Sequence, residues 1–166
     1  MVAAASVMRL TPLFKARGIC TALDYGAGTL RNSKYLLKKG FRVWVLDTEE
    51  KLEKYARNSG LPLAGLVEAG EARRCCLEVD LALANFVLNV LGGPKERRAV
   101  VENIYWNLRP GGLYLAEVAK KGREPWEGIV HSRELDELIV PIGFLKLKVL
   151  DMTTSLAVLY EKVTKM

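Results

Sequence analysis

The chain contains little of what metal sites and disulfide frameworks require. Its 166 residues include one histidine, His131, and three cysteines, of which Cys75 and Cys76 are adjacent and Cys20 stands alone. A single imidazole excludes a histidine-based metal site and any catalytic design that needs two histidines. The cysteine spacing fits neither a disulfide framework nor a zinc site. We therefore expect reduced, packed thiols and no metal ion.

Long apolar runs and a basic leader are also missing. The longest apolar run, residues 81–91, is too short to span a bilayer and contains Asn85 and Asn89. The first eight residues lack the basic start of a secretory signal. These absences predict a cytoplasmic protein that makes no membrane contact.

Glutamine is absent, whereas lysine, arginine and glutamate are plentiful, a bias reported for proteins from hot environments. The net charge of +6 favours anionic partners in general, although charge alone concerns association and solubility rather than fold. With 50% hydrophobic residues, the chain can bury a core without disulfides or metals. We expect a single domain over residues 1–166, in which residues 1–18 form a short cap interrupted by Pro12.

A glycine-containing turn is the most informative segment that is present. Leu23-Asp24-Tyr25-Gly26-Ala27-Gly28-Thr29 is followed, nineteen residues after Gly28, by Asp47 at the end of the apolar run 41–47. Glycines let the backbone approach a ligand closely, and a helix starting near Thr29 directs free N–H groups at a carboxylate or phosphate. Asp47 can accept both hydroxyls of a ribose. The spacing predicts a nucleotide-binding strand, turn and helix.

The order of these residues distinguishes between nucleotides. A dinucleotide fingerprint needs Gly-x-Gly-x-x-Gly, but Arg31 stands at the third glycine position, and an acid, Asp24, precedes Gly26 by two residues. A nicotinamide-dependent enzyme is therefore disfavoured.

The acid-first pattern resembles motif I of class I S-adenosylmethionine (SAM) methyltransferases. The resemblance extends to Asp47, to residues 79–88 and to residues 107–115, four landmarks in the family's order. Leu30 is a difference, because the family often has a third glycine there, and leucine leaves less room near the methionine part of the ligand. The resemblance implies a doubly wound α/β fold with a mostly parallel seven-stranded sheet.

The residue pattern predicts the remaining elements. Strands are expected over residues 20–25, 41–47, 64–69, 79–86 and 112–118, with helices that begin near Glu49, at Gly93-Pro94 and at Ser132. Pro110-Gly111 fits a type II turn before the fifth strand, and the last helix is expected to end near Ile139. Residues 145–150 and 156–163 are two strands joined by only five residues, too few for a crossover helix. They must therefore pair antiparallel.

The resemblance also implies a function, methyl transfer with SAM as the cofactor, and a set of cofactor contacts. These are Asp24, Gly26, Ala27, Gly28, Asp47, Thr48, Glu71, Asn85 and Phe86. Glu71 is equally consistent with a solvated surface residue, and Asp47 with a helix cap. The segment at Asn85 is not the Asn-Pro-Pro-Tyr type of many enzymes that methylate nucleic-acid amino groups. No catalytic base stands out, and a non-catalytic SAM-binding module that activates or scaffolds a partner is the alternative function.

Basic residues are expected on the rim of this site, because ligands in open α/β sheets lie outside the carboxyl ends of the strands. The predicted substrate rim consists of Asn89, Lys95, Arg97, Arg98, Lys120, Lys121, Arg123 and Trp126. It favours an anionic acceptor such as RNA or DNA, with Trp126 as a stacking surface for a base. The alternatives are that the charges are solvated surface and that Asn89 is a buried, satisfied amide. The acceptor stays open between a small molecule and a macromolecule, and the short N-terminus permits a dimer mate or partner subunit to close the site.

Overall fold

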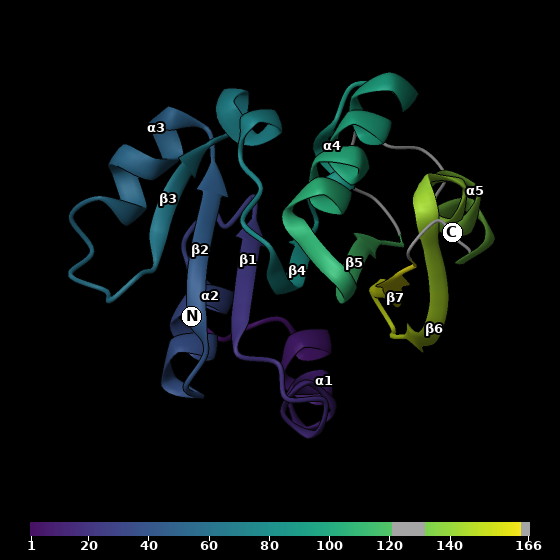
Figure 1. Cartoon of the computed structure of the whole chain (residues 1–166), viewed down its shortest axis with the longest axis horizontal. Coiled ribbons are helices and arrows are strands. Elements are labelled where there is room, and N and C mark those ends of the chain that lie inside the picture. Colours follow the sequence, from purple (N-terminus) through teal and green to yellow (C-terminus); the bar gives the residue numbers. More distant parts are fainter. Residues whose placement is uncertain (121–131, 164–166) are drawn as a thin grey trace.

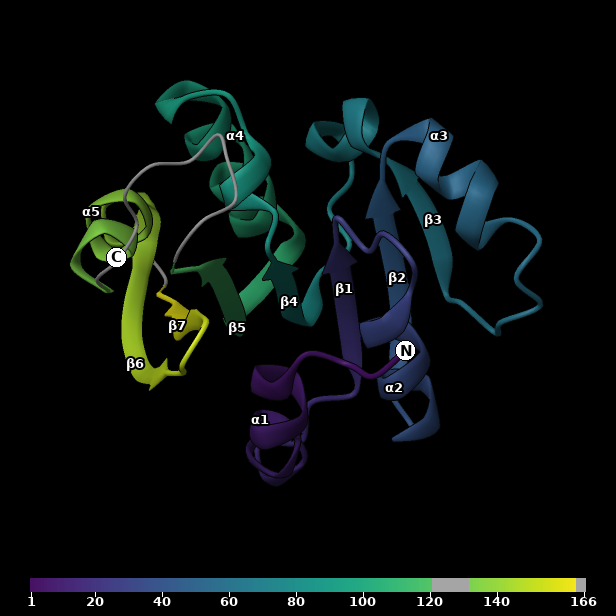
Figure 2. The same cartoon turned by 180° about the vertical axis from the view of Figure 1, so that it is seen from behind.

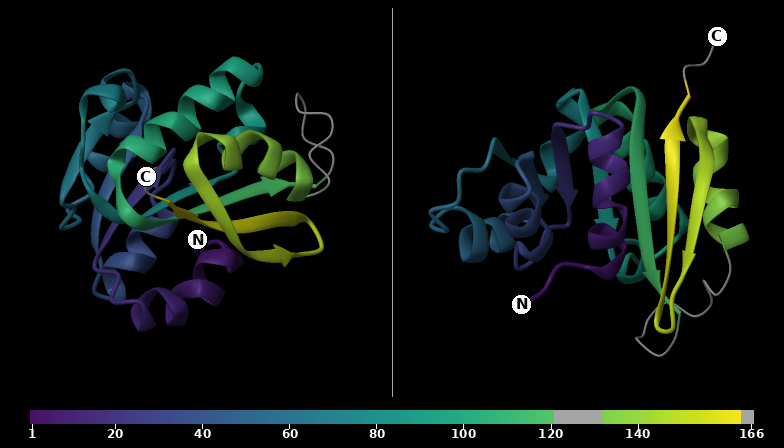
Figure 3. Two further views of the ribbon diagram at one scale, coloured as in Figure 1. Left: turned by 45° about the vertical axis from the view of Figure 1, so that its right-hand side comes forward. Right: turned by 90° about the horizontal axis from the view of Figure 1, so that it is seen from below.

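A computed structural model describes residues 1–120 and 132–163, with only the backbone of residues 72–74. The described residues form a seven-stranded sheet in the order β3-β2-β1-β4-β5-β7-β6 (Figure 1). Its first five strands are parallel: β1 (Thr21–Tyr25), β2 (Arg42–Asp47), β3 (Gly65–Glu68), β4 (Val79–Asn85) and β5 (Leu108–Ala119). Strand β7 (Ser155–Lys162) runs antiparallel to both β5 and β6 (Phe144–Asp151), as the right-hand view in Figure 3 shows. The predicted fold class and the predicted hairpin are confirmed.

Helices cover both faces of the sheet (Figures 1 and 2). One core cluster joins the sheet to α1 (Ala5–Ala16), α2 (Arg31–Lys38) and the continuous helix α3 (Glu49–Lys51) and η1 (Leu52–Ala56). The other joins it to α4 (Pro94–Asn107) and α5 (Ser132–Gly143). Two short 3₁₀ helices, η2 (Ala69–Arg74) and η3 (Leu88–Val90), follow β3 and β4. None of the helices in the described ranges is long and apolar enough to cross a membrane.

The central strand β4 explains why the sheet has helices on both sides. Leu81 and Leu83 are fully buried in the cluster with α1 and α2, whereas Ala82 and Ala84 are fully buried in the cluster with α4 and α5. A strand that is apolar on both faces needs cover on both, as in other parallel sheets.

The expected interruption at Pro12 is wrong. Helix α1 runs through Pro12, and Val7, Leu10 and Phe14 are buried against the sheet. Burial of this apolar face outweighs the one backbone hydrogen bond that proline removes. Residues 1–18 therefore contribute a full helix to the core.

The expected start of the fifth strand at residue 112 is also wrong. Strand β5 begins at Leu108, because Val79 pairs with Leu108 while Leu81 pairs with Leu113, so that the residues between bulge out. Gly111 has the positive φ, +73°, that a type II turn requires, yet the chain is paired with β4 on both sides of it. The Pro110-Gly111 pattern predicted the turn conformation, but it did not predict that the turn lies in a bulge within the paired strand.

Three helices differ from expectation in their ends or geometry. Helix α2 begins at Arg31 instead of near Thr29, and α5 extends to Gly143 instead of ending near Ile139. After Lys51 the third helix widens into π geometry, in which the Arg57 N–H donates to the Leu52 carbonyl at 3.0 Å. Local sequence patterns rarely fix such boundaries.

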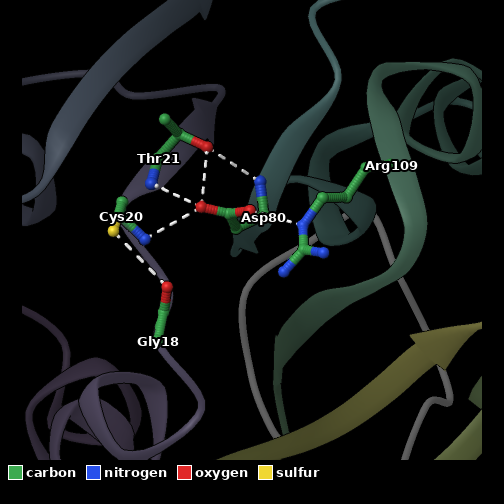
Figure 4. Close-up of polar contacts among 5 residues, drawn as sticks. All are labelled: Gly18, Cys20, Thr21, Asp80 and Arg109. Carbon is green, nitrogen blue, oxygen red and sulfur yellow. Dashed lines mark hydrogen bonds and ion pairs between the residues drawn. The ribbon is translucent and has the colours of Figure 1, made fainter.

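Asp80 fastens β1 to β4 at the amino-terminal edge of the sheet (Figure 4). Its Oδ2 accepts hydrogen bonds from the backbone N–H groups of Cys20 (2.8 Å) and Thr21 (2.9 Å) and from the Thr21 hydroxyl (3.0 Å). Its Oδ1 forms an ion pair with Arg109. This contact lies at the end of the strands opposite to the candidate site.

Candidate functional site

The loop after β1 takes a shape that glycine permits. Gly26 and Gly28 have φ of +69° and +51°, and the Gly26 N–H donates to the Leu46 carbonyl at 2.7 Å. A Cβ on Gly26 would lie 2.5 Å from a methyl carbon of Val87, whereas a Cβ on Gly28 would meet open space. The loop is thus held against β2 and the segment after β4, and it stays open on the Gly28 side, where a ligand can approach the backbone.

The carboxylate of Asp47 faces this loop from the end of β2. Its Oδ2 accepts the Gly28 N–H and its Oδ1 accepts the Thr48 N–H, both at 2.8 Å. An ionised carboxylate accepts about four hydrogen bonds, so the half-buried group keeps capacity for both hydroxyls of a ribose. The residues present therefore fit the ribose of the expected cofactor.

Asp24 lies beneath the loop, buried at the end of β1. Its Oδ2 accepts a hydrogen bond of 2.6 Å from the Ser33 hydroxyl in α2. Burial raises the pKa of Asp24 to about 6, against the opposing effect of its hydrogen bonds with Ser33, and the charge of Asp47 raises it further. The carboxyl group thus joins β1 to α2, and its predicted direct contact with the cofactor stays a prediction.

Leu30 occupies the position at which the resembling family often has glycine. Its φ of +64° is in the left-handed region, and its side chain is 1% exposed in the cluster with α1 and α2. A leucine with positive φ is strained, and burial of the side chain in the core offsets that strain.

The end of β4 also contains strained backbone. Phe86 has a φ of +62°, and its N–H donates to the Glu117 carbonyl at 2.8 Å. The Arg31 guanidinium lies 5.6 Å from the centroid of the Phe86 ring. Strained residues of this kind cluster at ligand sites. Phe86 lies next to the glycine loop, because the side chain of the following residue, Val87, packs against Gly26.

Asn85 is held by side chains from other elements. Its Nδ2 donates to Glu117 Oε2 at 2.5 Å, and its Oδ1 accepts from Asn32 Nδ2 at 3.2 Å. Glu117 was not among the predicted site residues, although an acid in the otherwise apolar run 113–119 was a usable signal. It is 2% exposed and also accepts hydrogen bonds from the hydroxyls of Ser6 (2.6 Å) and Ser155 (2.8 Å).

Glu71 is exposed in η2 and lines a cavity of about 530 Å³. The other lining residues are Glu49, Leu52, Arg57, Leu66 and Glu68. Glu68 ends β3 beside Asp47 in the sheet register and accepts the Gly70 N–H at 2.9 Å. Glu68 is therefore a second acid, missed from sequence, that could reach an adenine bound beyond β2 and β3.

The residues of the predicted substrate rim have different surroundings in the structure. Asn89 is buried and accepts the Ala119 N–H at 3.0 Å, as its alternative interpretation stated. Lys120 is paired with Asp151, and Arg98 with Glu102 at 2.8 Å. Burial lowers the pKa of Arg97, while Lys95 is exposed. Lys121, Arg123, Trp126 and His131 lie outside the described residues.

The family described as "Methyltransferase domain" matches residues 23–116, from β1 into β5. This range includes the glycine loop, Asp47 and Asn85. The comparison with curated proteins found no match to the chain.

Solved structures of similar shape include three methyltransferases. The 1,6-didemethyltoxoflavin-N1-methyltransferase of Burkholderia thailandensis, with bound 1,6-didemethyltoxoflavin and S-adenosylhomocysteine (SAH), is 20% identical with a TM-score of 0.74, over 96% of this chain and 79% of that one. Human N-acetylserotonin methyltransferase in complex with SAM is 18% identical with a TM-score of 0.72, over 96% and 52%. A SAM-dependent methyltransferase from Aquifex aeolicus is 19% identical with a TM-score of 0.71, over 96% and 94%. At these identities the likeness shows a shared fold.

Proposed function

Because the chain belongs to the methyltransferase domain family, with SAM as its cofactor, we propose that it transfers the methyl group of SAM to a small-molecule acceptor. The observation that carries this proposal is the pairing of the Gly26–Gly28 loop with Asp47, whose Oδ2 accepts the Gly28 N–H at 2.8 Å. Open backbone and a carboxylate that would accept the ribose hydroxyls thus lie together at one end of the sheet.

The chain's own residues divide the work of binding. Asp47 and Thr48 would hold the ribose, Gly26, Ala27 and Gly28 would lie against the methionine part, and Glu68 or Glu71 would reach the adenine. When bound, SAM supplies a methyl group on a sulfonium, which an acceptor atom attacks in line. The protein then contributes proximity, alignment and removal of water. Asn85 and Phe86 would line the side from which the acceptor approaches.

Charge pairing supports a small acceptor over a nucleic acid. A surface that contacts several phosphates needs several uncommitted cations, but Lys120 and Arg98 already have carboxylate partners. The Burkholderia thailandensis enzyme binds a small heterocycle, and the human enzyme is named for N-acetylserotonin. Methylation of a nucleic acid is the competing outcome of the test.

The experiment has two stages. Calorimetry first measures the binding of SAM, SAH and NAD, and we expect micromolar affinity for the first two and none for NAD. Incubation with methyl-labelled SAM and fractionated extract then identifies the labelled product by mass spectrometry. A labelled small molecule supports the proposal, whereas a labelled nucleic acid replaces it. SAM binding without any labelled product favours the alternative of a non-catalytic SAM-binding module.

A further inference from the structure

Glu117 is a buried acid that accepts hydrogen bonds from three other elements, an arrangement that core packing alone does not require. It lies at the carboxyl end of β5, 2% exposed, and its two oxygens accept hydrogen bonds from Ser6 in α1, Asn85 in β4 and Ser155 in β7. Burial of a charged side chain is costly unless donors compensate it. Here three neutral donors from three elements do so, and none of the ion pairs among the described residues includes Glu117. The carboxyl group is thus surrounded by neutral donors rather than by a cation.

The register of the strands places this charge near the proposed methyl group. Glu117 is paired with Asn85 across β4 and β5, and Leu83 in β4 is paired with Asp24 in β1. The glycine loop follows β1, so it lies two strand spacings, about 10 Å, from Glu117. With the ribose at Asp47 and the methionine part over the loop, the sulfur would lie between the ends of β2 and β1, about two to three strand spacings from Glu117.

A second contact connects the same group of residues to the loop. Asn32 in α2 donates to Asn85 Oδ1 at 3.2 Å and accepts the Ala4 N–H at 2.9 Å. In Figure 2 the N-terminal segment crosses β1 toward α2. Ser6 is fully buried where it donates to Glu117, and Ala4 is 5% exposed. Water is thus limited around Glu117, and a charge acts over longer distances where water is excluded.

We propose that Glu117 is a specificity-determining residue of the cofactor site, whose buried negative charge favours the sulfonium cation of SAM over the neutral thioether of SAH. The proposal rests on the proposed function. Preference for the charged methyl donor would promote exchange of SAH for SAM after each transfer. Asn85, hydrogen-bonded to Glu117, is held in place by the same carboxylate.

The test is the ratio of the affinities for SAM and SAH, measured by calorimetry on the whole chain. Glu117→Gln keeps the shape and removes the charge, so we expect SAM to lose about three- to fifteenfold in affinity relative to SAH, for unit charges about 10–15 Å apart in a partly water-excluded site. A purely structural role would weaken both ligands equally, because SAM and SAH differ only at sulfur. An unchanged ratio in this variant overturns the proposal.

Asp80→Asn is the matched control, because Asp80 is also a carboxylate with three donors but lies at the opposite end of β4 (Figure 4). It should lower the melting temperature and leave the SAM-to-SAH ratio unchanged. A similar fall in the ratio for Asp80→Asn would mean that loss of stability, not the position of the charge, is responsible.

Ser155→Ala keeps the proposal testable even if Glu117→Gln does not fold. It removes one donor but retains the charge, so the ratio should stay at the wild-type value. A fall in the ratio of about threefold or more would assign the effect to packing and overturn the proposal. If the wild-type chain binds neither SAM nor SAH, the proposed function itself fails, whereas binding of both with an unaltered ratio in Glu117→Gln removes only the role of Glu117.

Discussion

At the scale of single residues, the proposed cofactor site depends most directly on Asp47. Asp47→Ala removes the proposed acceptor of the ribose hydroxyls together with the acceptor of the Gly28 N–H. We expect the affinity for SAM to fall about ten- to a hundredfold, or roughly 1.5–3 kcal/mol for hydrogen bonds to a charged acceptor. Calorimetry measures this change, and Glu137→Ala, at an exposed residue of α5, is the control. Unchanged affinity in Asp47→Ala would remove Asp47 from the site.

The buried carboxyl group of Asp24 makes the free energy of unfolding depend on pH. The ordinary pKa of its carboxyl group is 3.8, and burial raises it to about 6 in the folded protein. A raised folded pKa means that the contribution to stability is complete below the unfolded pKa and is lost as the pH rises through 6. Asp24→Asn should therefore raise the free energy of unfolding at pH 7 by up to about 3 kcal/mol, at 1.36 kcal/mol per pKa unit.

Urea unfolding at pH 4 and pH 7 tests this expectation, since the gain should be much smaller at pH 4. The asparagine can still accept the Ser33 hydroxyl, so the loop should keep its shape. An equal change in stability at both pH values would show that Asp24 is not titrating between them.

At Leu30, backbone strain and side-chain burial act in opposite directions on the stability of the fold. Leu30→Gly relieves about 1–2 kcal/mol of left-handed strain, but it removes a fully buried leucine, which costs about 2–5 kcal/mol. Burial should win, with a net loss of about 1–3 kcal/mol in the free energy of unfolding. A Leu30→Gly variant that is more stable than the wild type in urea unfolding would show that strain outweighs packing at this turn.

At the scale of elements, Asp80 joins the first residues of β1 to β4 and to Arg109 of β5. Burial acts to raise the pKa of Asp80, but the hydrogen bonds from Cys20 and Thr21 and the charge of Arg109 outweigh it, and the pKa is lowered. A lowered folded pKa gives a contribution that is complete above the ordinary value of 3.8 and is lost as the pH falls through the folded pKa.

Asp80→Ala should accordingly lower the free energy of unfolding at pH 7 by about 2–3 kcal/mol, the size of hydrogen bonds to a charged group. The difference from the wild type should shrink as the pH falls below 3.8, which thermal unfolding in acid can follow. Asp151→Ala, at the exposed last residue of β6, is the control. A difference that is constant down to pH 2 would contradict this assignment.

At the scale of the whole molecule, ligand binding should stabilise the fold. SAM at a hundred times its dissociation constant should add about 2.7 kcal/mol, if the unfolded chain does not bind it. We expect a rise in melting temperature with SAM and with SAH, and none with NAD. A rise with NAD alone would contradict the reading of Asp24 and Arg31 as marks of a SAM site.

The sequence by itself determined the order of the elements and the class of the fold. Alternating apolar runs and turn residues set β1, β2 and β4 to within one residue, and the five-residue link before Leu156 left the last two strands no arrangement but an antiparallel hairpin. The Asp24, Gly26, Gly28 and Asp47 spacing indicated the cofactor class for the same reason: a turn conformation and a strand end are local properties. The predicted cytoplasmic location and the predicted dimer mate stay predictions.

Only the tertiary structure decided which distant side chains meet. Ser6, Asn85 and Ser155 lie far apart in the sequence and no local pattern relates them. The fold nevertheless brings α1, β4 and β7 beside β5, so that all three side chains donate to the carboxylate of Glu117. The same holds for Lys120, predicted as a free cation and found paired with Asp151. Local conformation follows from neighbouring residues. The partner of a buried or charged group instead depends on the packing of the whole chain, because an unpaired polar group becomes costly only when folding removes it from water.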